Sequence, residues 1–250
     1  MPMKFALPLI AALVASTPVF AQDTIGTGPN QISVDIGLGA AYKPTYQGSD
    51  EFEATPWLIM RDLRLRGYGA GENSGFSISP NVNLVGKRNA DDDERLEGLD
   101  EIGYAYELGL KATYNVGQTT AYATMRKGFG GHHGITGALG ATYRFETTDR
   151  MTFWAGLEAG YGNDRYNETY FGVSDAEAAR TDYSAYTPGG GFNSAAISLE
   201  GRYQLAPNTA IMGEVKFSRL IGDAGDSPIV EDRNQPSIKL GIVRTLNFAF

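Results

Sequence analysis

Hydrophobic and polar residues alternate in twos along most of this chain, and the last fifteen residues show the pattern most clearly. Counted back in twos from the end, one face carries Phe250, Phe248, Leu246, Arg244, Ile242, Leu240 and Ile238, while the other face is small or polar. Successive side chains of a β-strand point to opposite sides, so this segment is predicted to be a strand with one apolar face. Arg244 is the exception on that face, which indicates an interfacial position or a local irregularity.

Ten other segments carry the same pattern, and together they predict the fold. The alternation is clean in 32–42, 76–84, 104–114, 135–145, 193–205 and 209–217, and mixed in 55–62, 63–71, 119–128 and 151–161. Such strands, repeated between turns, are typical of a membrane β-barrel whose apolar faces contact lipid. We therefore predict an all-β, closed, antiparallel transmembrane barrel. The segments number eleven, whereas bacterial single-chain barrels have an even number of strands. The miscount is expected within 55–86, where the segments are short. Twelve strands are preferred, and ten remain the alternative.

The connections between these segments alternate in length, and this gives the barrel an orientation. The dipeptides 117–118, 148–149 and 207–208 read as tight turns, whereas 87–101, 162–190 and 222–235 are long and polar. Barrels of this class have short periplasmic turns and longer extracellular loops. The three long loops are therefore expected on the outside of the cell.

Charged residues recur on the polar faces of the predicted strands and would point into the lumen. They are Asp35, Glu107, Lys111, Arg144, Glu158, Glu200, Arg202, Glu214, Lys216 and Lys239. Unpaired charges in a narrow lumen are costly, so the mixed signs favour ion pairing over a wide pore. We expect Lys111, Arg202 and Lys216 to neutralise Glu107, Glu200 and Glu214, respectively. A charged constriction that selects solutes is the alternative.

The amino terminus and the composition indicate an exported protein. Residues 1–21 combine Lys4, an apolar run and the ending Val19-Phe20-Ala21, which is typical of a cleaved secretory signal, so 22–250 would form the barrel. Without Lys4 the chain has 20 basic and 29 acidic residues, a balance that argues against nucleic-acid binding. It has no cysteine, which excludes thiolate metal sites. No phosphate loop, dinucleotide fingerprint or zinc spacing is present, so no cofactor is predicted.

Four polar clusters in the loops are candidate sites. Ser174 and Glu177 form a capping box that predicts a short helix. Asp223 and Asp226 favour an Asp-stabilised turn, with a calcium site as the weaker alternative. The acidic run 91–94 reads as a solvated loop, although it could bind divalent cations near lipopolysaccharide.

The pair His132-His133 is the fourth cluster. Adjacent histidines in a strand point to opposite faces, which disfavours one shared metal ion. They are the two histidines of the chain, and hence the candidate bases for a lipid hydrolase. The sequence lacks a Gly-x-Ser-x-Gly elbow, so a non-enzymatic protein is predicted.

Three ordered motifs resemble one family. Gly37–Asp50 (GLGAAYKPTYQGSD), Tyr170–Ser174 (YFGVS) followed by Glu177-Ala178, and Arg219–Val230 (RLIGDAGDSPIV) are similar to motifs of the MipA/OmpV family of outer-membrane proteins. The resemblance covers essentially the whole mature chain. Two departures are Gly225, where the family more often has Ala, and the ending Asn247–Phe250, which lacks the usual Tyr-Arg-Phe.

The resemblance implies an outer-membrane location and a role in binding. The member that names the family implies a scaffold for a murein lytic transglycosylase and a bifunctional penicillin-binding synthase, whereas other members resemble porins or adhesion proteins. Outer-membrane lipid, lipopolysaccharide and peptidoglycan-remodelling enzymes are therefore the expected partners. Phe250 is expected to be read by the barrel insertion machinery. The candidate interaction residues in the loops are Tyr46, Gly48, Ser49, Asp50, Tyr170, Phe171, Gly172, Ser174, Glu177, Asp223, Asp226 and Ser227.

Overall fold

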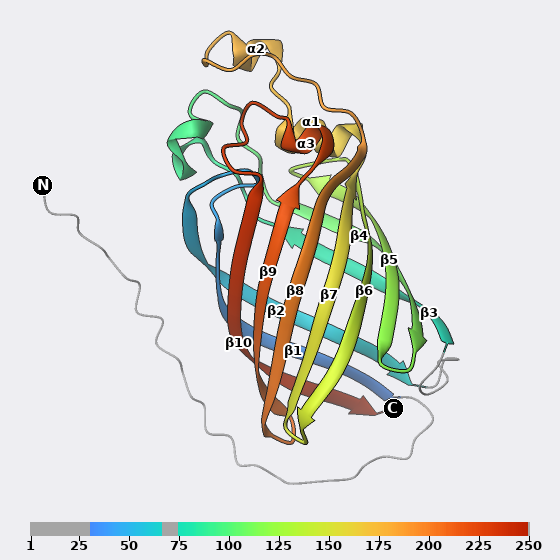
Figure 1. Ribbon diagram of the computed structural model, residues 1–250. Helices are drawn as coiled ribbons and strands as arrows, with labels where there is room; N and C mark the ends of the chain where they lie inside the picture. The colour runs from blue at the N-terminus through green and yellow to red at the C-terminus, as the bar shows by residue number, and fades with distance from the viewer. Residues whose placement is uncertain (1–30, 67–74, 250) are drawn as a thin grey trace, which may run out of the picture.

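Ten antiparallel strands form one strongly curled sheet in the computed structural model (Figure 1), which describes residues 31–66 and 75–249. The predicted signal segment 1–21 and Phe250 lie outside these ranges. The strands are β1 (Gln31–Pro44), β2 (Phe52–Arg66), β3 (Gly75–Val85), β4 (Ala105–Val116), β5 (Thr119–Gly130), β6 (Ile135–Thr148), β7 (Met151–Gly162), β8 (Gly191–Ala206), β9 (Thr209–Leu220) and β10 (Asn234–Ala249). The all-β prediction is confirmed.

The described residues form ten strands, which agrees with the alternative of ten and not with the preferred twelve. The expected segments 55–62 and 63–71 belong to one strand, β2, as far as residue 66. Its pairing with β1 shifts register between Ser33 and Asp35, whose partners are Arg64 and Arg61. A bulge at this point adds residues to one strand and reverses its in–out alternation. A single strand with such a bulge looks like two short strands in the sequence.

Strands that are neighbours in sequence pair with each other except β2 and β3, and β10 closes back onto β1. The order is β2-β1-β10-β9-β8-β7-β6-β5-β4-β3, held by nine ladders. β2 and β3 are therefore the two ends of the sheet. Within residues 31–66 and 75–249, no ladder joins these two strands. The curled sheet encloses a lumen, with a seam between β2 and β3.

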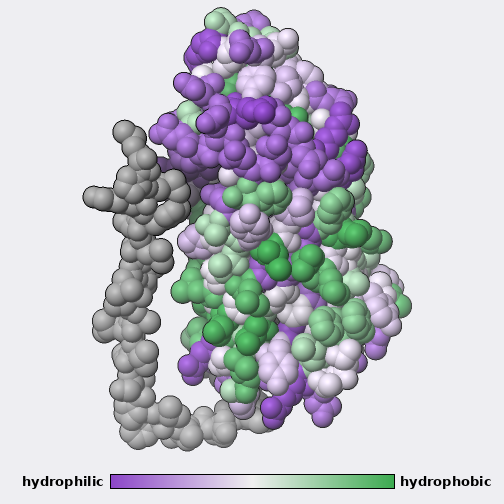
Figure 2. Space-filling view, turned by 60° about the vertical axis from the view of Figure 1, so that its left-hand side comes forward, coloured by the Kyte–Doolittle hydropathy of each residue, from purple (hydrophilic) through white to green (hydrophobic). Residues whose placement is uncertain are grey.

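The outer face of the sheet is apolar, as the alternation predicts. Leu38, Leu108, Leu110, Val215 and Ile242 are all more than half exposed. Figure 2 shows a green apolar zone over the wall of the barrel and a purple polar zone over its loop end. Such a band is the surface that a barrel presents to hydrocarbon. No described helix is long and apolar enough to cross a bilayer.

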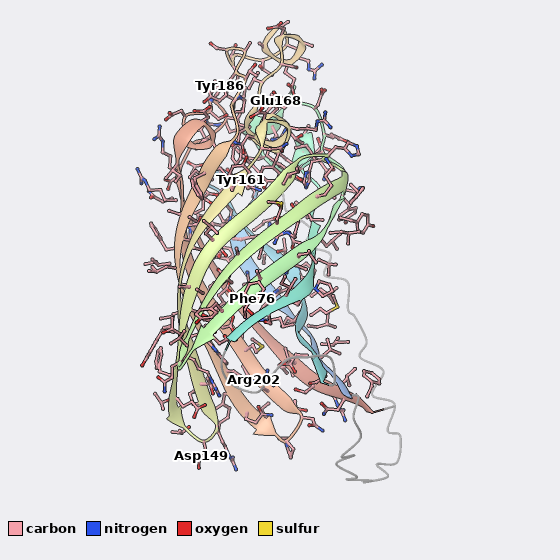
Figure 3. All side chains as sticks on the ribbon, turned by 90° about the vertical axis from the view of Figure 1, so that its right-hand side faces the viewer. Phe76, Asp149, Tyr161, Glu168, Tyr186 and Arg202 are labelled. Atoms are coloured by element: carbon pink, nitrogen blue, oxygen red, sulfur yellow. The ribbon has the colours of Figure 1, made fainter. Side chains whose placement is uncertain are left out.

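The two ends of the barrel differ as expected. Two-residue turns follow β4, β6 and β8, whereas the connections after β3, β7 and β9 are long. The connection after β7 contains the helices α1 (Asp164–Phe171) and α2 (Asp175–Ala178), and the one after β9 contains α3 (Gly222–Gly225). Figure 3 shows Asp149 at the end with the turns, and Glu168 and Tyr186 at the end with the loops. Arg244 pairs with Thr209, directly beside the 207–208 turn. This residue therefore lies at the predicted periplasmic edge of the apolar band.

Lipid exposure of the outer face can be tested at Leu110 in the middle of β4. Leu110→Arg is expected to lower the free energy of unfolding in lipid vesicles by about 2–4 kcal/mol, because a charge would enter the hydrocarbon. Val116→Arg is the matched control, since Val116 is also exposed but lies beside the 117–118 turn. Its cost should be about 0–1 kcal/mol. Equal urea midpoints for the two variants would contradict the assignment of this face to lipid.

Candidate functional site

The lumen is a polar cavity of about 790 Å³ that extends from the middle of the barrel to the loops. Ten charged residues were predicted to point inward, and nine of them either line the cavity or form ion pairs inside the barrel. Arg144 shares the inner face but lies at the open periplasmic end, where its side chain is 54% exposed and pairs with Glu146. Mixed charge in the lumen is therefore confirmed, and its pairing decides what the lumen can do.

Two layers of side chains occupy the lumen near the periplasmic turns. Arg202 on β8 forms an ion pair with Asp35 on β1, and Thr245 on β10 donates a hydrogen bond to the same carboxylate at 2.5 Å. Arg202 lies in the lower part of the barrel in Figure 3. The next layer is apolar, with the buried side chains of Ile59, Ala210, Met212 and Val243 in mutual contact. An ion pair and an apolar cluster thus occupy the inside of the barrel at this end.

Three further ion pairs lie in the middle of the lumen. Arg61 pairs with Glu200, Lys239 with Glu214 at 2.8 Å, and Lys216 with Glu158 at 2.8 Å. The hydroxyl of Tyr122 also donates to Glu158 at 2.7 Å, and the Nζ of Lys111 lies 4.7 Å from the Tyr122 ring centroid. Opposite charges satisfy each other here, as they must where water is scarce.

Glu107 is the centre of the outermost polar layer, and its side chain is only 2% exposed. Its carboxylate accepts hydrogen bonds from Arg126 at 2.8 Å, Asn83 at 2.9 Å and Thr136 at 3.2 Å. The Nε2 atom of His132 lies 3.2 Å from Oε1, the carboxylate oxygen that also accepts from Thr136. This layer ties β3, β4, β5 and β6 together beneath the loops.

The predicted partners of Glu107, Glu200 and Glu214 were wrong, although their neutralisation is confirmed. We expected partners on the same strand, but each partner comes from another strand: Arg126, Arg61 and Lys239. Residues on one strand face are separated by about 6.6 Å for every two positions along the strand. Neighbouring and opposite strands of a narrow, curled sheet bring side chains closer than that.

The extracellular loops pack into a cap over the lumen, and the three family-like motifs meet there. The Tyr46 hydroxyl donates to the Ile229 carbonyl at 2.9 Å, and the Ser227 hydroxyl donates to the Phe171 carbonyl at 2.5 Å. Phe171 is fully buried, with Tyr166 and Tyr170 beside it. Tyr46 and Ile229, which are 183 positions apart, share a second small cluster.

Gly48 fixes the contact between the first and third motifs. Its φ is 111°, in the region that favours glycine, and a Cβ there would lie 2.7 Å from Val230. Its carbonyl accepts hydrogen bonds from the N–H groups of Glu231 and Asp232, and its N–H donates to Gln235. A side chain at this position would clash as well as strain the backbone.

Buried charges brace the cap from within. Asp93 accepts hydrogen bonds from Ser49 at 2.8 Å and Thr45 at 3.0 Å, so the acidic run 91–94 is partly a structural hub and not simply a solvated loop. Arg88 is also buried and donates to the Tyr170 carbonyl at 3.1 Å, and desolvation lowers its pKa.

The predicted capping box is confirmed at the start of α2. The Ser174 hydroxyl accepts from the Glu177 N–H, and the Glu177 carboxylate accepts from the Ser174 N–H at 2.8 Å. Glu177 also accepts from the Asp100 N–H at 2.9 Å, which joins two loops. Burial alone would raise the pKa of Glu177, but these hydrogen bonds and the charge of Arg88 outweigh it and hold the pKa below its ordinary value of 4.5.

The other predicted interaction residues lie on the surface of the cap. Asp50, Ser174, Asp223 and Asp226 are exposed, and Gly172 ends α1. Asp223 accepts from the Gly189 N–H at 2.8 Å, and Asp226 pairs with Arg233 at 2.6 Å. Within the described ranges, no group of three or more His, Asp and Glu side chains could hold a metal ion.

The two adjacent histidines have different environments. His132 is buried against Tyr166 and Tyr170, its Nδ1 accepts from the Gly134 N–H at 3.3 Å, and its Nε2 faces Glu107. His133 is exposed. Both ring nitrogens of His132 therefore face groups of the barrel itself.

Sequence reasoning missed several of the side chains that close the barrel. Arg61 and Arg126 lie in segments whose faces were mixed, and Arg88 and Asp93 lie in a loop without periodicity. The alternation could have placed Arg126 inside, because it is in phase with Tyr122 on β5. Nothing in the sequence signals the burial of Arg88 or Asp93.

The chain matches one protein family along most of its length. The family model described as "MltA-interacting protein MipA" matches residues 36–246. The MltA-interacting protein of Escherichia coli (strain K12) is 26% identical, with 96% of this chain and 98% of that protein covered. Outer membrane protein OmpV of Vibrio cholerae is 27% identical, with 93% and 95% covered.

Solved structures with similar features are outer-membrane barrels. OprD from Pseudomonas aeruginosa has a TM-score of 0.35 at 15% identity, covering 70% of this chain and 49% of that one. Ail, the attachment invasion locus protein of Yersinia pestis, has a TM-score of 0.29 at 11% identity, covering 87% and 99%.

Acid should loosen the cap through Glu177. A carboxylate with a lowered pKa stabilises the folded state fully above its ordinary pKa, and this contribution is lost as the pH falls below 4.5 through the lowered value. Glu177→Gln should destabilise the cap at pH 7 by about 1–3 kcal/mol and flatten its pH dependence below pH 4.5. Near-UV circular dichroism of the cap tyrosines during heating measures both effects. Glu97→Gln, at an exposed loop position, is the control, and an equal response of the two variants would contradict this role.

Proposed function

Since this chain belongs to the MipA family and is an outer-membrane β-barrel protein, we propose that it acts by binding other molecules, and not by conducting solutes or by catalysis. The observation that supports this proposal is the closure of the lumen. An ion-pair layer and an apolar layer lie inside the periplasmic end, and a packed loop cap lies at the other end. Ion channels instead keep a continuous path through rings of charge or carbonyl groups.

The proposal of a non-enzymatic role also draws on the chemistry of the buried groups. An acid–base catalyst must reach the proton that it transfers. His132, the buried histidine, faces Gly134 with one ring nitrogen and Glu107 with the other. The lumen carboxylates accept hydrogen bonds from basic side chains. These groups are more simply explained as mutual neutralisation than as a catalytic site.

Planar-bilayer recording tests the closed lumen. The wild-type protein is expected to insert with little or no conductance, whereas Arg202→Ala combined with Met212→Ala and Ile59→Ala should open the periplasmic end and conduct. Currents from the triple variant would show that the barrel inserts into the bilayer. Arg165→Ala, on the exposed face of α1, should behave like wild type. Open-pore currents from the wild-type protein would overturn the proposal and favour the porin alternative.

For the partner, we propose peptidoglycan-remodelling enzymes bound at the periplasmic end. The support is the name of the relatives, MltA-interacting protein. At this end the described chain exposes the turns after β4, β6 and β8, with the charged residues Arg144, Glu146 and Arg150 beside one of them. An exposed loop surface of the cap is the alternative, and it would suit adhesion.

A capture experiment separates these two surfaces. The protein in detergent micelles is immobilised and exposed to a purified murein lytic transglycosylase. Arg144→Glu with Arg150→Glu should weaken capture at least about tenfold, as expected when like charges meet at an interface. Charge reversal of Arg165 and Arg180 in the cap is the matched control and should leave capture unchanged. Loss of capture only with the cap variant, or no capture at all, would refute the periplasmic scaffold.

A further inference from the structure

The seam between β2 and β3 is the one break in the ladders of the described sheet. Backbone N–H and C=O groups at a strand edge need partners, and hydrocarbon offers none. Both strands contain an interior proline, Pro56 and Pro80, and proline in a sheet is typical of edge strands because it lacks an N–H. The sequence and the ladder order therefore agree that these strands are edges.

The lumen cavity lies directly behind this seam. It is lined by Arg61 from β2 and by Asn81 and Asn83 from β3, as well as by the opposite wall of the barrel. A molecule that enters between the two edges would reach the polar interior without passing the cap or the periplasmic layers. Such a path would make the seam a sideways route from the membrane to the cavity.

Basic side chains outnumber carboxylates around the cavity. The carboxylates are Glu107, Glu158, Glu200 and Glu214. The basic residues are Lys43, Arg61, Lys87, Arg88, Lys111, Arg126 and Lys216. Even after Lys43 is set against Glu53, with which it pairs at 2.8 Å, the basic side chains exceed the carboxylates by two. The cavity therefore favours an anion.

Two hydroxyl groups of cavity-lining residues are buried and have no hydrogen-bond partner among the described residues. They are Thr124 Oγ1 and the Tyr170 hydroxyl. Thr124 stands opposite Lys111 in the β4–β5 register, so a hydroxyl donor and an ammonium group lie together on one wall. Buried polar groups are normally hydrogen-bonded. A phosphate oxygen could accept from both the Thr124 hydroxyl and the Lys111 ammonium group.

Apolar side chains flank the outside of the seam. Leu58 and Met60 on β2 and Phe76 and Ile78 on β3 are all at least 60% exposed, and Figure 3 shows Phe76 on the outer side of the edge strand. An acyl chain could lie along either strand. The polar cavity inside the seam thus suits the head group of an amphiphile, and the apolar side chains outside it suit the acyl chains.

We propose that the seam binds one anionic phospholipid from the surrounding membrane. Its phosphate enters the cavity beside Lys111 and Thr124, and its acyl chains remain in the bilayer against β2 and β3. The head group supplies acceptors for the unpaired hydroxyl donors and for edge N–H groups, and its charge offsets the excess of basic side chains. The lipid completes the wall of the barrel where the ladder is interrupted.

Native mass spectrometry of the delipidated protein tests this site. Phosphatidylglycerol should bind with one-to-one stoichiometry at least about tenfold more tightly than phosphatidylcholine with the same chains. Lys111→Met should reduce that affinity about tenfold, as expected for the loss of one charge-assisted contact. Arg165→Met removes the same charge from the exposed cap and should change nothing. Equal binding of the two lipids by the wild-type protein would overturn the proposal, whether or not the variants fold.

Photo-crosslinking locates the lipid and distinguishes other occupants of the seam. Phosphatidylglycerol with a diazirine in its acyl chain, in phosphatidylcholine vesicles, should label β2 and β3 in preference to β6–β8. Millimolar inorganic phosphate should compete only weakly, because it lacks the chains. Even labelling around the barrel, full competition by phosphate, or a dimer of this chain with an unlabelled seam would each refute the lipid site.

Discussion

The rest of the structure depends on the need to satisfy every backbone polar group inside a bilayer. A sheet meets this need through its ladders, and its two-residue alternation then turns one set of side chains to lipid and the other to the lumen. Away from the edges of the apolar band, charge can survive in these strands only on the inner face. The narrow lumen is consequently crowded with carboxylates and basic groups. The ion pairs of Asp35 with Arg202 and of Glu107 with Arg126 follow from that crowding.

The alternation in the sequence was sufficient to predict the class of fold, the outer face and the orientation. It failed where the pattern itself is interrupted, since the register shift opposite Ser33 and Asp35 made β2 look like two strands. It could not name ion-pair partners, because the partner of Glu200 is Arg61, 139 positions away. That contact depends on how strongly the sheet curls, which is a property of all ten strands together.

The cap was the least predictable part of the molecule. Its residues have no period, so Asp93 in an acidic run and Arg88 in a polar loop gave no sign of burial. The capping box at Ser174 was predictable because its two hydrogen bonds involve residues three positions apart. The motifs at 37–50, 170–178 and 219–230 have a structural basis that the sequence did not reveal. They meet through the Tyr46–Ile229, Gly48–Glu231 and Ser227–Phe171 hydrogen bonds.

This packing changes how the loop motifs should be understood. Tyr46, Ser49, Phe171 and Ser227 are buried, so substitutions there would act on the folding of the cap before they act on any partner. Asp50, Ser174 and Asp223 keep exposed side chains and are better placed to touch another molecule. The cap thus has a rigid interior that holds a small set of exposed groups in fixed positions. A binding role for these loops must therefore be sought in that exposed set, with the buried set serving as its support.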